Sequence, residues 1–382
     1  MDKSRRNHLK NLVQSSAAAA CAVAVTLAIA PTSQATPTSP SPRLSINGCT
    51  IKRYANCPNK DLRGVSLPFV DLYSGYFYGA RLGNSDIHNA DIRYANFRNA
   101  SLYNVRAEHV SGKGANFRFS QLRRARFYAG DLTGAKFERA RLIDTDLEAA
   151  TLTSANLVRA DLTRSRMIWV RGRGAKFDDA NLDRAALGRG WLASATFRGA
   201  YLQYAGFNDA ELVKADFRKS PSAKTGHRKT RANLANFDRS NLQEANFRGA
   251  DLRGSTFNGA TGYRMDFKST SMGSTWWTSA DIHLGNFRYT RMVRSHILNA
   301  RFTSSDLRNS DLRLGDFRGT NFSGTTMRNA DLRGVNFEGA VLQSVDFRGT
   351  RTTGANFGSA NLTGAVWRNG RICGANSIGV CR

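Results

Sequence analysis

The chain contains few prolines, few histidines and few acidic residues. Of its 382 residues, only 7 are proline, 6 are histidine and 29 are Asp or Glu, against 56 Lys or Arg. The histidines are scattered, and none lies at metal-ligand spacing from another. Serine and cysteine nucleophile motifs are also missing. The sequence therefore indicates neither an enzyme nor a cofactor or metal site.

The shortage of acidic residues leaves a formal net charge of +27. Such an excess favours anionic partners such as nucleic acid, cell-wall polyanions or acidic lipid headgroups, and it says nothing about the fold. Apolar residues are plentiful and regularly placed, which argues against a low-complexity tail.

Residues 1–35 are typical of an export signal. A basic segment at residues 3–10 (KSRRNHLK) is followed by an apolar run at residues 15–30 and by a small-residue cleavage site at Ser33 to Ala35. The apolar run is too short for a comfortable membrane span. Either a Sec or a twin-arginine signal fits, and both predict a protein of the cell envelope or the extracellular space. Residues 36–48, which include PTSPSP, are expected to form a linker before a single domain at residues 49–382.

Four cysteines remain after the signal, in two pairs that are each eight residues apart. They are Cys49, Cys57, Cys373 and Cys381. An even number in an exported chain favours disulfides. We predict local pairing, Cys49 with Cys57 and Cys373 with Cys381, and no metal site, because the pairs lie at opposite ends and no histidine accompanies them.

A large apolar residue recurs every five positions, as at Leu332, Phe337, Leu342 and Phe347. The series keeps its phase for 63 positions, from Leu62 to Ile372. A small residue lies two positions before each of these centres, and Asp or Asn often stands between them. Neither a strand nor a helix has a period of five. A fixed internal period predicts a solenoid, in which stacked units bury a shared apolar face.

The Phe residues reveal how many repeats make one turn. Every fourth centre from Phe77 to Phe357 is Phe in twelve of fifteen positions: Phe77, Phe97, Phe117, Phe137, Leu157, Phe177, Phe197, Phe217, Phe237, Phe257, Trp277, Ile297, Phe317, Phe337 and Phe357. This sorting predicts a twenty-residue coil of four repeats, with these side chains stacked along one side.

The repeats resemble the pentapeptide-repeat family over residues 60 to 376. The resemblance implies an all-β fold, a right-handed quadrilateral β-helix whose centre and small residues point inward. About sixteen coils stacked about 4.8 Å apart would give a rod about 75 Å long. The two cysteine pairs would then act as staples at its ends, where open strand edges need caps.

One basic segment, residues 219–231, departs from the pattern and is expected to protrude as an insertion. Two arrangements are open at this point. If the segment forms a distorted coil, Phe217 and Phe237 stay in one stack. If it is looped out, the Phe stack must move to a neighbouring side there.

A run of basic residues follows the centres on one predicted side. Its members are Arg228, Arg248, Lys268, Arg288, Arg308, Arg328, Arg348 and Arg368. The same side of the N-terminal half, from Pro68 to Asn208, is expected to carry no Lys or Arg. Cations stacked about 4.8 Å apart lie within the roughly 8 Å Debye length, so a bound polyanion would relieve their repulsion. Alternatively, the run is a solvated ladder that Asp266, Asp306 and Asp346 partly neutralise.

These features favour a non-catalytic, exported and monomeric rod that contacts an anionic polymer, either a cell-wall phosphate polymer or nucleic acid, and takes no small-molecule substrate. A structural envelope protein without a specific ligand is the alternative. The family resemblance also implies a second, less favoured alternative, a protein directed at DNA gyrase, since some cytoplasmic members look like duplex DNA and bind gyrase. Such mimicry needs a strongly negative surface, and this chain is strongly positive.

Overall fold

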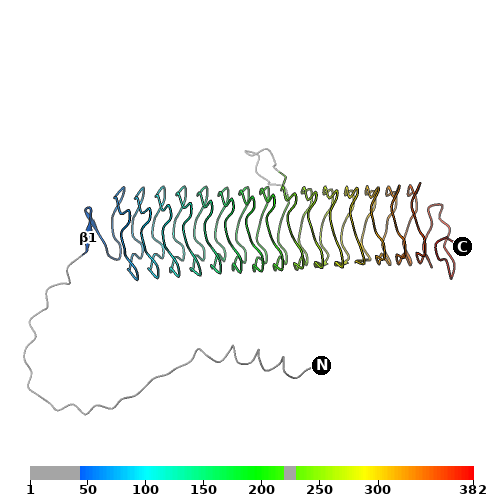
Figure 1. Cartoon of the computed structure of the whole chain (residues 1–382), viewed down its shortest axis with the longest axis horizontal. Coiled ribbons are helices and arrows are strands. Elements are labelled where there is room, and N and C mark those ends of the chain that lie inside the picture. Colours follow the sequence, from blue (N-terminus) through cyan, green and yellow to red (C-terminus); the bar gives the residue numbers. More distant parts are fainter. Residues whose placement is uncertain (1–43, 219–228) are drawn as a thin grey trace, which may run out of the picture. The chain divides into compact units, whose positions relative to one another are not determined.

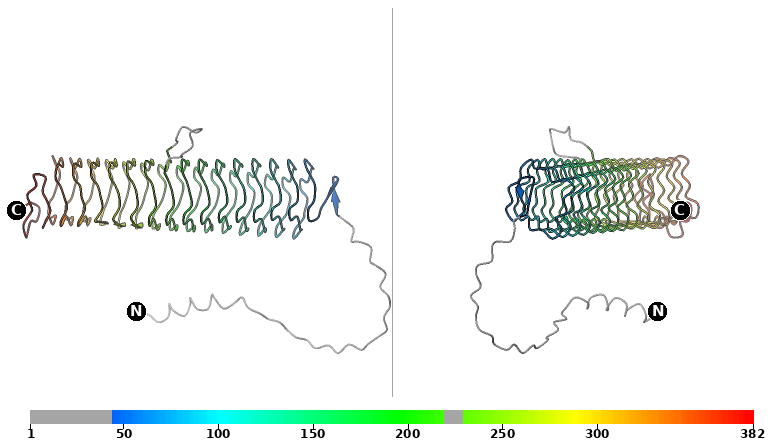
Figure 2. Two further views of the ribbon diagram at one scale, coloured as in Figure 1. Left: turned by 180° about the vertical axis from the view of Figure 1, so that it is seen from behind. Right: turned by 60° about the vertical axis from the view of Figure 1, so that its left-hand side comes forward.

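The computed structural model describes residues 44–218 and 229–382, which belong to one compact unit that starts at Arg43. This unit is a rod of stacked coils (Figure 1). Two further views show the same stacking from behind and obliquely along the rod (Figure 2). The expectation of a β-solenoid built from a repeat is therefore confirmed.

Regular strands are short and few among the described residues. A hairpin of β1 (Ser45–Ile46) and β2 (Cys49–Thr50) precedes the coils. Three parallel strands lie side by side in the C-terminal half: β3 (Thr261–Tyr263), β4 (Asp281–His283) and β5 (Arg301–Thr303). Elsewhere neighbouring coils pair through isolated parallel bridges.

The bridges join residues that are twenty positions apart, which confirms the period that the Phe pattern predicted. Each coil contributes four bridging residues, so the rod has four faces. We name them A to D after the first bridging residue of each: Asn56 for face A, Asp61 for B, Ser66 for C and Asp71 for D.

The five-residue unit is a short extended segment followed by a tight turn. The carbonyl oxygen of the centre accepts a hydrogen bond from the N–H of the next small residue, as from Ala250 to Phe247 at 2.9 Å. The second turn residue has a positive φ, 71° at Gly249. Gly and Asn tolerate this conformation best, which explains their frequency at that position.

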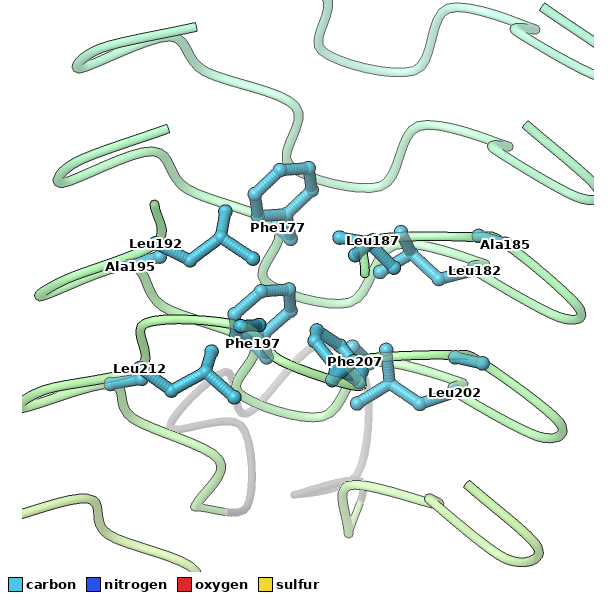
Figure 3. Close-up of a cluster of buried hydrophobic side chains, with 14 of the residues drawn as sticks. Phe177, Leu182, Ala185, Leu187, Leu192, Ala195, Phe197, Leu202, Phe207 and Leu212 are labelled. Atoms are coloured by element: carbon cyan, nitrogen blue, oxygen red, sulfur yellow. The ribbon is translucent and has the colours of Figure 1, made fainter. Parts of the chain in front are cut away.

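The interior is filled by one large and one small side chain from each side of every coil. Figure 3 shows Phe177 above Phe197, and Leu192 above Leu212, with Ala195 beside them. The Phe177 and Phe197 rings are stacked with centroids 4.9 Å apart, and both are fully buried. Stacking identical shapes at the coil spacing packs the narrow bore without voids.

Where glycine stands at the centre of a repeat, a neighbouring side chain fills the space inside the coil. A Cβ added at Gly112 would lie 2.8 Å from Leu132 Cδ2, and one at Gly172 would lie 2.8 Å from Leu192 Cδ2. At Gly262 the side chain of Met265 takes the space. The weak centres in the sequence are thus compensated within one coil.

The register changes once, at the basic insertion. Tyr201 pairs with Arg231 and Asp216 with Asn246, so residues thirty positions apart are neighbours there. Ten residues are therefore extruded from the coil, which is the second of the two arrangements that the sequence left open. Residues 219–228 lie outside the described residues. Arg231, the last residue of the predicted insertion, is already part of a coil.

The single Phe stack predicted from the sequence is therefore wrong beyond Phe217. Phe217 stacks on Phe247, with centroids 4.4 Å apart, whereas Phe237 stacks on Phe207 at 5.1 Å. Ten residues are two repeats, so the series that continues from Phe237 lies on face C, opposite face A. The expected move to a neighbouring side is corrected to a move across the bore.

Both ends of the rod carry a disulfide, Cys49–Cys57 and Cys373–Cys381. The first ties the β1–β2 hairpin to the first coil, and this hairpin includes Ser45 and Ile46 from the segment assigned to a linker. At the other end, the chain folds back so that Ile378 pairs antiparallel with Asn361. These contacts cover part of the strand edges that solenoid ends expose.

Deleting residues 219–228 is expected to leave the thermal unfolding midpoint within a few degrees of the intact protein. The deletion joins Arg218 to Lys229 and places fully buried Thr230 in the small-residue position of an ordinary repeat. Thermal unfolding followed by circular dichroism checks this. Deleting residues 229–238, of equal length, removes buried Phe237 and should lower the midpoint strongly; equal effects would contradict the register change.

A candidate polyanion-binding surface

The residue after each centre is held at the surface by the Asp or Asn before that centre. The side-chain oxygen accepts the backbone N–H two residues later, as from Thr133 to Asp131 at 3.0 Å and from Arg333 to Asp331 at 3.3 Å. This hydrogen bond explains why Asp and Asn recur at that position. It fixes the direction in which the next side chain leaves the rod.

The register change alters which residues share the basic surface. On face A the bridges run without a gap from Thr196 to Val366, and the residue two positions after each bridging residue is basic in nine consecutive coils. We call these the cationic column: Arg198, Arg218, Arg248, Lys268, Arg288, Arg308, Arg328, Arg348 and Arg368. Seven of the eight residues predicted from the sequence are members, and the eighth, Arg228, lies outside the described residues.

Two members, Arg198 and Arg218, were missed by the sequence analysis. The residues from Pro68 to Asn208 that were assigned to the same side lie on face C instead, because the insertion moves the register by two repeats. At the same position of the repeat, the N-terminal part of face A carries two further cations, Arg98 and Arg118. The sequence offered one signal of this shift. Ten residues are a whole number of repeats but only half of a twenty-residue coil, so their loss from the coil moves every later residue to the opposite face.

Most of the arginines in the column share a carboxylate with a neighbour. Asp216 contacts both Arg198 (Nε to Oδ2, 2.6 Å) and Arg218 (Nη2 to Oδ2, 2.7 Å). Asp306 lies 2.6 Å from Arg308 Nη2 and 3.9 Å from Arg288 Nε.

Of the two remaining carboxylates of the column, one contacts two arginines and the other contacts one. Asp346 lies 2.7 Å from Arg348 Nη2 and 3.9 Å from Arg328 Nε, and Asp266 lies 2.7 Å from Arg248 Nη2. Within the described residues, no carboxylate pairs with Lys268 or Arg368.

Two of these carboxylates, Asp346 and Asp216, are held in the ionised form by the arginines beside them. Hydrogen bonds from Arg348 hold the pKa of Asp346 below its ordinary value, against a smaller opposing effect of burial. For Asp216, burial opposes ionisation, but the hydrogen bonds from Arg218 and Arg198 outweigh it and also lower the pKa. Nine cations against four carboxylates leave the column with five excess positive charges (9 − 4 = 5).

Three cations of the neighbouring face B are locally paired. Arg253, Arg313 and Arg333 each pair with the aspartate two residues earlier, at 2.7 to 2.8 Å. The local ladder that the sequence proposed as an alternative is thus complete at these three positions, whereas Arg231, Arg291 and Arg351 of face B have no ion pair among the described residues. Face A differs in carrying a cation in each of nine consecutive coils, which makes it the stronger candidate for an extended anionic ligand.

Asp306→Asn combined with Asp346→Asn is expected to raise affinity for a labelled DNA duplex about tenfold. The change frees four arginines from intramolecular pairs and increases the excess charge of the column. Fluorescence anisotropy at fixed salt measures it. Asp311→Asn with Asp331→Asn is the matched control on face B; an equal gain there would mean that only net charge matters.

Comparison with known proteins identifies the class of this rod. The family model for pentapeptide repeats matches eight copies, over residues 90–127, 131–167, 180–218, 228–261, 300–339, 316–351 and 340–376. The chain belongs to the pentapeptide-repeat family. The match does not point to any family of enzymes.

Several solved structures are similar to this chain. HetL, a pentapeptide repeat protein involved in heterocyst differentiation regulation in the cyanobacterium Nostoc sp. strain PCC 7120, is 20% identical, with 82% of this chain and 92% of HetL covered and a TM-score of 0.21. Trypsin-treated QnrB1, a plasmid-mediated fluoroquinolone resistance protein, is 19% identical, with 59% and 89% covered and a TM-score of 0.28.

A pentapeptide repeat protein from the Arabidopsis thaliana thylakoid lumen is 21% identical, with 38% of this chain and 69% of that protein covered and a TM-score of 0.18. The comparison with curated proteins returns no match. Within residues 44–218 and 229–382, no helix has the length and apolar character needed to cross a membrane.

Proposed function

We propose that the protein is an exported, non-catalytic rod that binds an anionic polymer along its cationic column. The observation that carries this proposal is the unbroken series of nine basic side chains on face A with only four carboxylates among them. Cations at about the 4.8 Å coil spacing repel one another within the Debye length, and phosphates or carboxylates of a linear polymer would neutralise them.

The pairing geometry also suits such a ligand. A carboxylate that holds one edge of a guanidinium orients the group along the face of the rod, and its other N–H groups remain available as donors. The column is continuous because the coils stack in register, so an extended polymer can follow it over many contacts. Many weak contacts of this kind add up to salt-dependent binding.

The proposal also includes the geometry of the coils and the route by which the protein is exported. We take it to be a right-handed quadrilateral β-helix of about sixteen coils that is delivered to the cell envelope or beyond by the signal at residues 1–35. That signal and the linker that follows it lie outside the described residues, except for the end of the linker from Leu44 on.

Binding to defined polymers tests the proposal. The protein from residue 36 onward, with both disulfides formed, is titrated with a DNA duplex, with a poly(glycerol phosphate) cell-wall polymer and with neutral dextran at several salt concentrations. We expect affinity for the phosphate polymers to fall steeply as salt rises. Preference for one of the two polymers identifies the ligand class. Absence of salt-dependent binding to both would favour the structural envelope protein without a ligand.

A further inference from the structure

A cleft lies on face B beside the register change. Its larger part has a volume of about 930 Å³, and a smaller part of about 260 Å³ lies at the corner next to Gly199. Tyr201 and Arg231 line both parts, so the two lie next to each other. This cleft is separate from the cationic column, and no feature of the sequence pointed to it.

Small residues create the hollow. Gly254, Gly273 and Ser274 line it, where the next coils of face B carry larger side chains such as Arg294, Arg313 and Leu314. A Cβ at Gly273 would meet only the Val293 carbonyl oxygen, at 3.4 Å. A side chain at this position would therefore extend into the cleft rather than into the rod.

The polar groups in the cleft are of mixed type. Arg231 is exposed, and no hydrogen bond or ion pair of its guanidinium is found among the described residues. Asp251 accepts hydrogen bonds from Arg253 (2.8 Å) and from Asn233 (3.1 Å). Gln203 and the hydroxyl of Tyr201 are hydrogen-bonded to each other at the opposite wall.

This mixture selects for a particular ligand chemistry. An unpaired guanidinium is suited to a carboxylate or phosphate group. A carboxylate beside two side-chain amides is suited to hydroxyl groups, which can donate to the first and exchange hydrogen bonds with the others. A polyphosphate would leave Asp251, Asn233 and Gln203 without hydroxyl partners, and a neutral sugar would leave Arg231 without a partner.

We infer that this cleft binds one acidic sugar unit, a pyranose ring that carries a carboxylate or phosphate group. Arg231 receives the anionic group, while Asp251, Asn233 and Gln203 bind the ring hydroxyls. The inference goes beyond the proposed function, since it concerns another face and does not require the column. A glycan that contains such units would be anchored here at one sugar.

Isothermal titration of the oxidised protein with trigalacturonate and with glucose 6-phosphate tests the cleft and separates the two sources of the anionic group. Maltotriose supplies the hydroxyls alone, and tripolyphosphate supplies the charge alone. We expect at least one acidic sugar to bind more tightly than both controls. Arg231→Gln should weaken that binding about tenfold or more, as expected for loss of a charge-assisted hydrogen bond.

Two further variants make the result decisive. Gly273→Gln, which fills the cleft, should also weaken the binding about tenfold or more. Arg291→Gln removes the same charge from the same position of face B, three coils beyond Arg231 and outside the cleft, and should leave the affinity unchanged.

Binding that Arg231→Gln and Arg291→Gln affect equally, or binding no tighter than that of tripolyphosphate, would overturn the inference. Substitutions in the cationic column should leave sugar binding unchanged. The experiments can therefore contradict the proposal for the cleft without contradicting the proposal for the column, and the reverse.

Discussion

Replacing Arg288, Arg308, Arg328 and Arg348 by glutamine is expected to flatten the slope of log affinity against log salt by about three to four units for duplex DNA. Each phosphate contact releases counterions that contribute about 0.9 to this slope, so four lost contacts account for the change. The same protein should bind more weakly at low salt. Titrations at four or more salt concentrations supply the slope.

A matched set of four substitutions separates the column from total charge. Arg106, Arg126, Arg166 and Arg318 all lie on face C, opposite the column, and each has a carboxylate within 4 Å, like most members of the column. Glutamine at these positions removes the same four charges. The slope should change by less than about one unit in this control. Equal flattening in both sets would show that the column is a solvated ladder without a special role.

Phe247→Ala is expected to lower the free energy of unfolding by about 3–5 kcal/mol. Phe247 is fully buried and stacked between Phe217 (centroids 4.4 Å apart) and Phe267 (4.8 Å), so its removal opens a cavity that the coils on either side cannot close. In a solenoid each coil contacts only its neighbours, and the loss is therefore concentrated at one place along the rod. Chemical unfolding measured by circular dichroism gives the value.

Phe357→Ala is the comparison at the end of the rod. Phe357 is only partly buried and stacks on one Phe, Phe337, at 5.3 Å. Its removal should cost clearly less, because solvent already reaches part of the ring. Similar losses for the two variants would argue against a continuous aromatic stack across the register change.

Much of the fold follows from local pattern. The five-residue period, the inward small residue before each centre and the twenty-residue coil could all be predicted, because every repeat must place the same atoms in the same narrow bore. Within the C-terminal half, Phe317, Phe337 and Phe357 follow one another on one face as expected: Phe317 meets Phe337 edge to face, with centroids 5.5 Å apart, and Phe337 stacks on Phe357 at 5.3 Å. The use of Asp131 and Asp331 to hold the turn was likewise predictable, since the hydrogen bond closes within three residues.

The composition of the candidate site could be predicted only in part. The members from Arg248 to Arg368 were predicted correctly because no irregular segment interrupts the repeats between them. Arg198 and Arg218 were missed because residues on the two sides of the insertion can be aligned only when it is known how many residues leave the coil. The carboxylates that pair with the column were partly foreseen, but Asp216 lies before the insertion and was missed for the same reason.

By itself, the sequence determined the local geometry of this protein: the length of the repeat, the identity of the buried side chains, the turn chemistry and the excess of positive charge. These depend on interactions within a coil or between adjacent regular coils. Only the tertiary structure decided which side chains share a face across residues 219–228 and where the face B cleft lies. Both depend on a ten-residue shift in register, which becomes visible only in the pairing of the coils on its two sides, Tyr201 with Arg231 and Asp216 with Asn246.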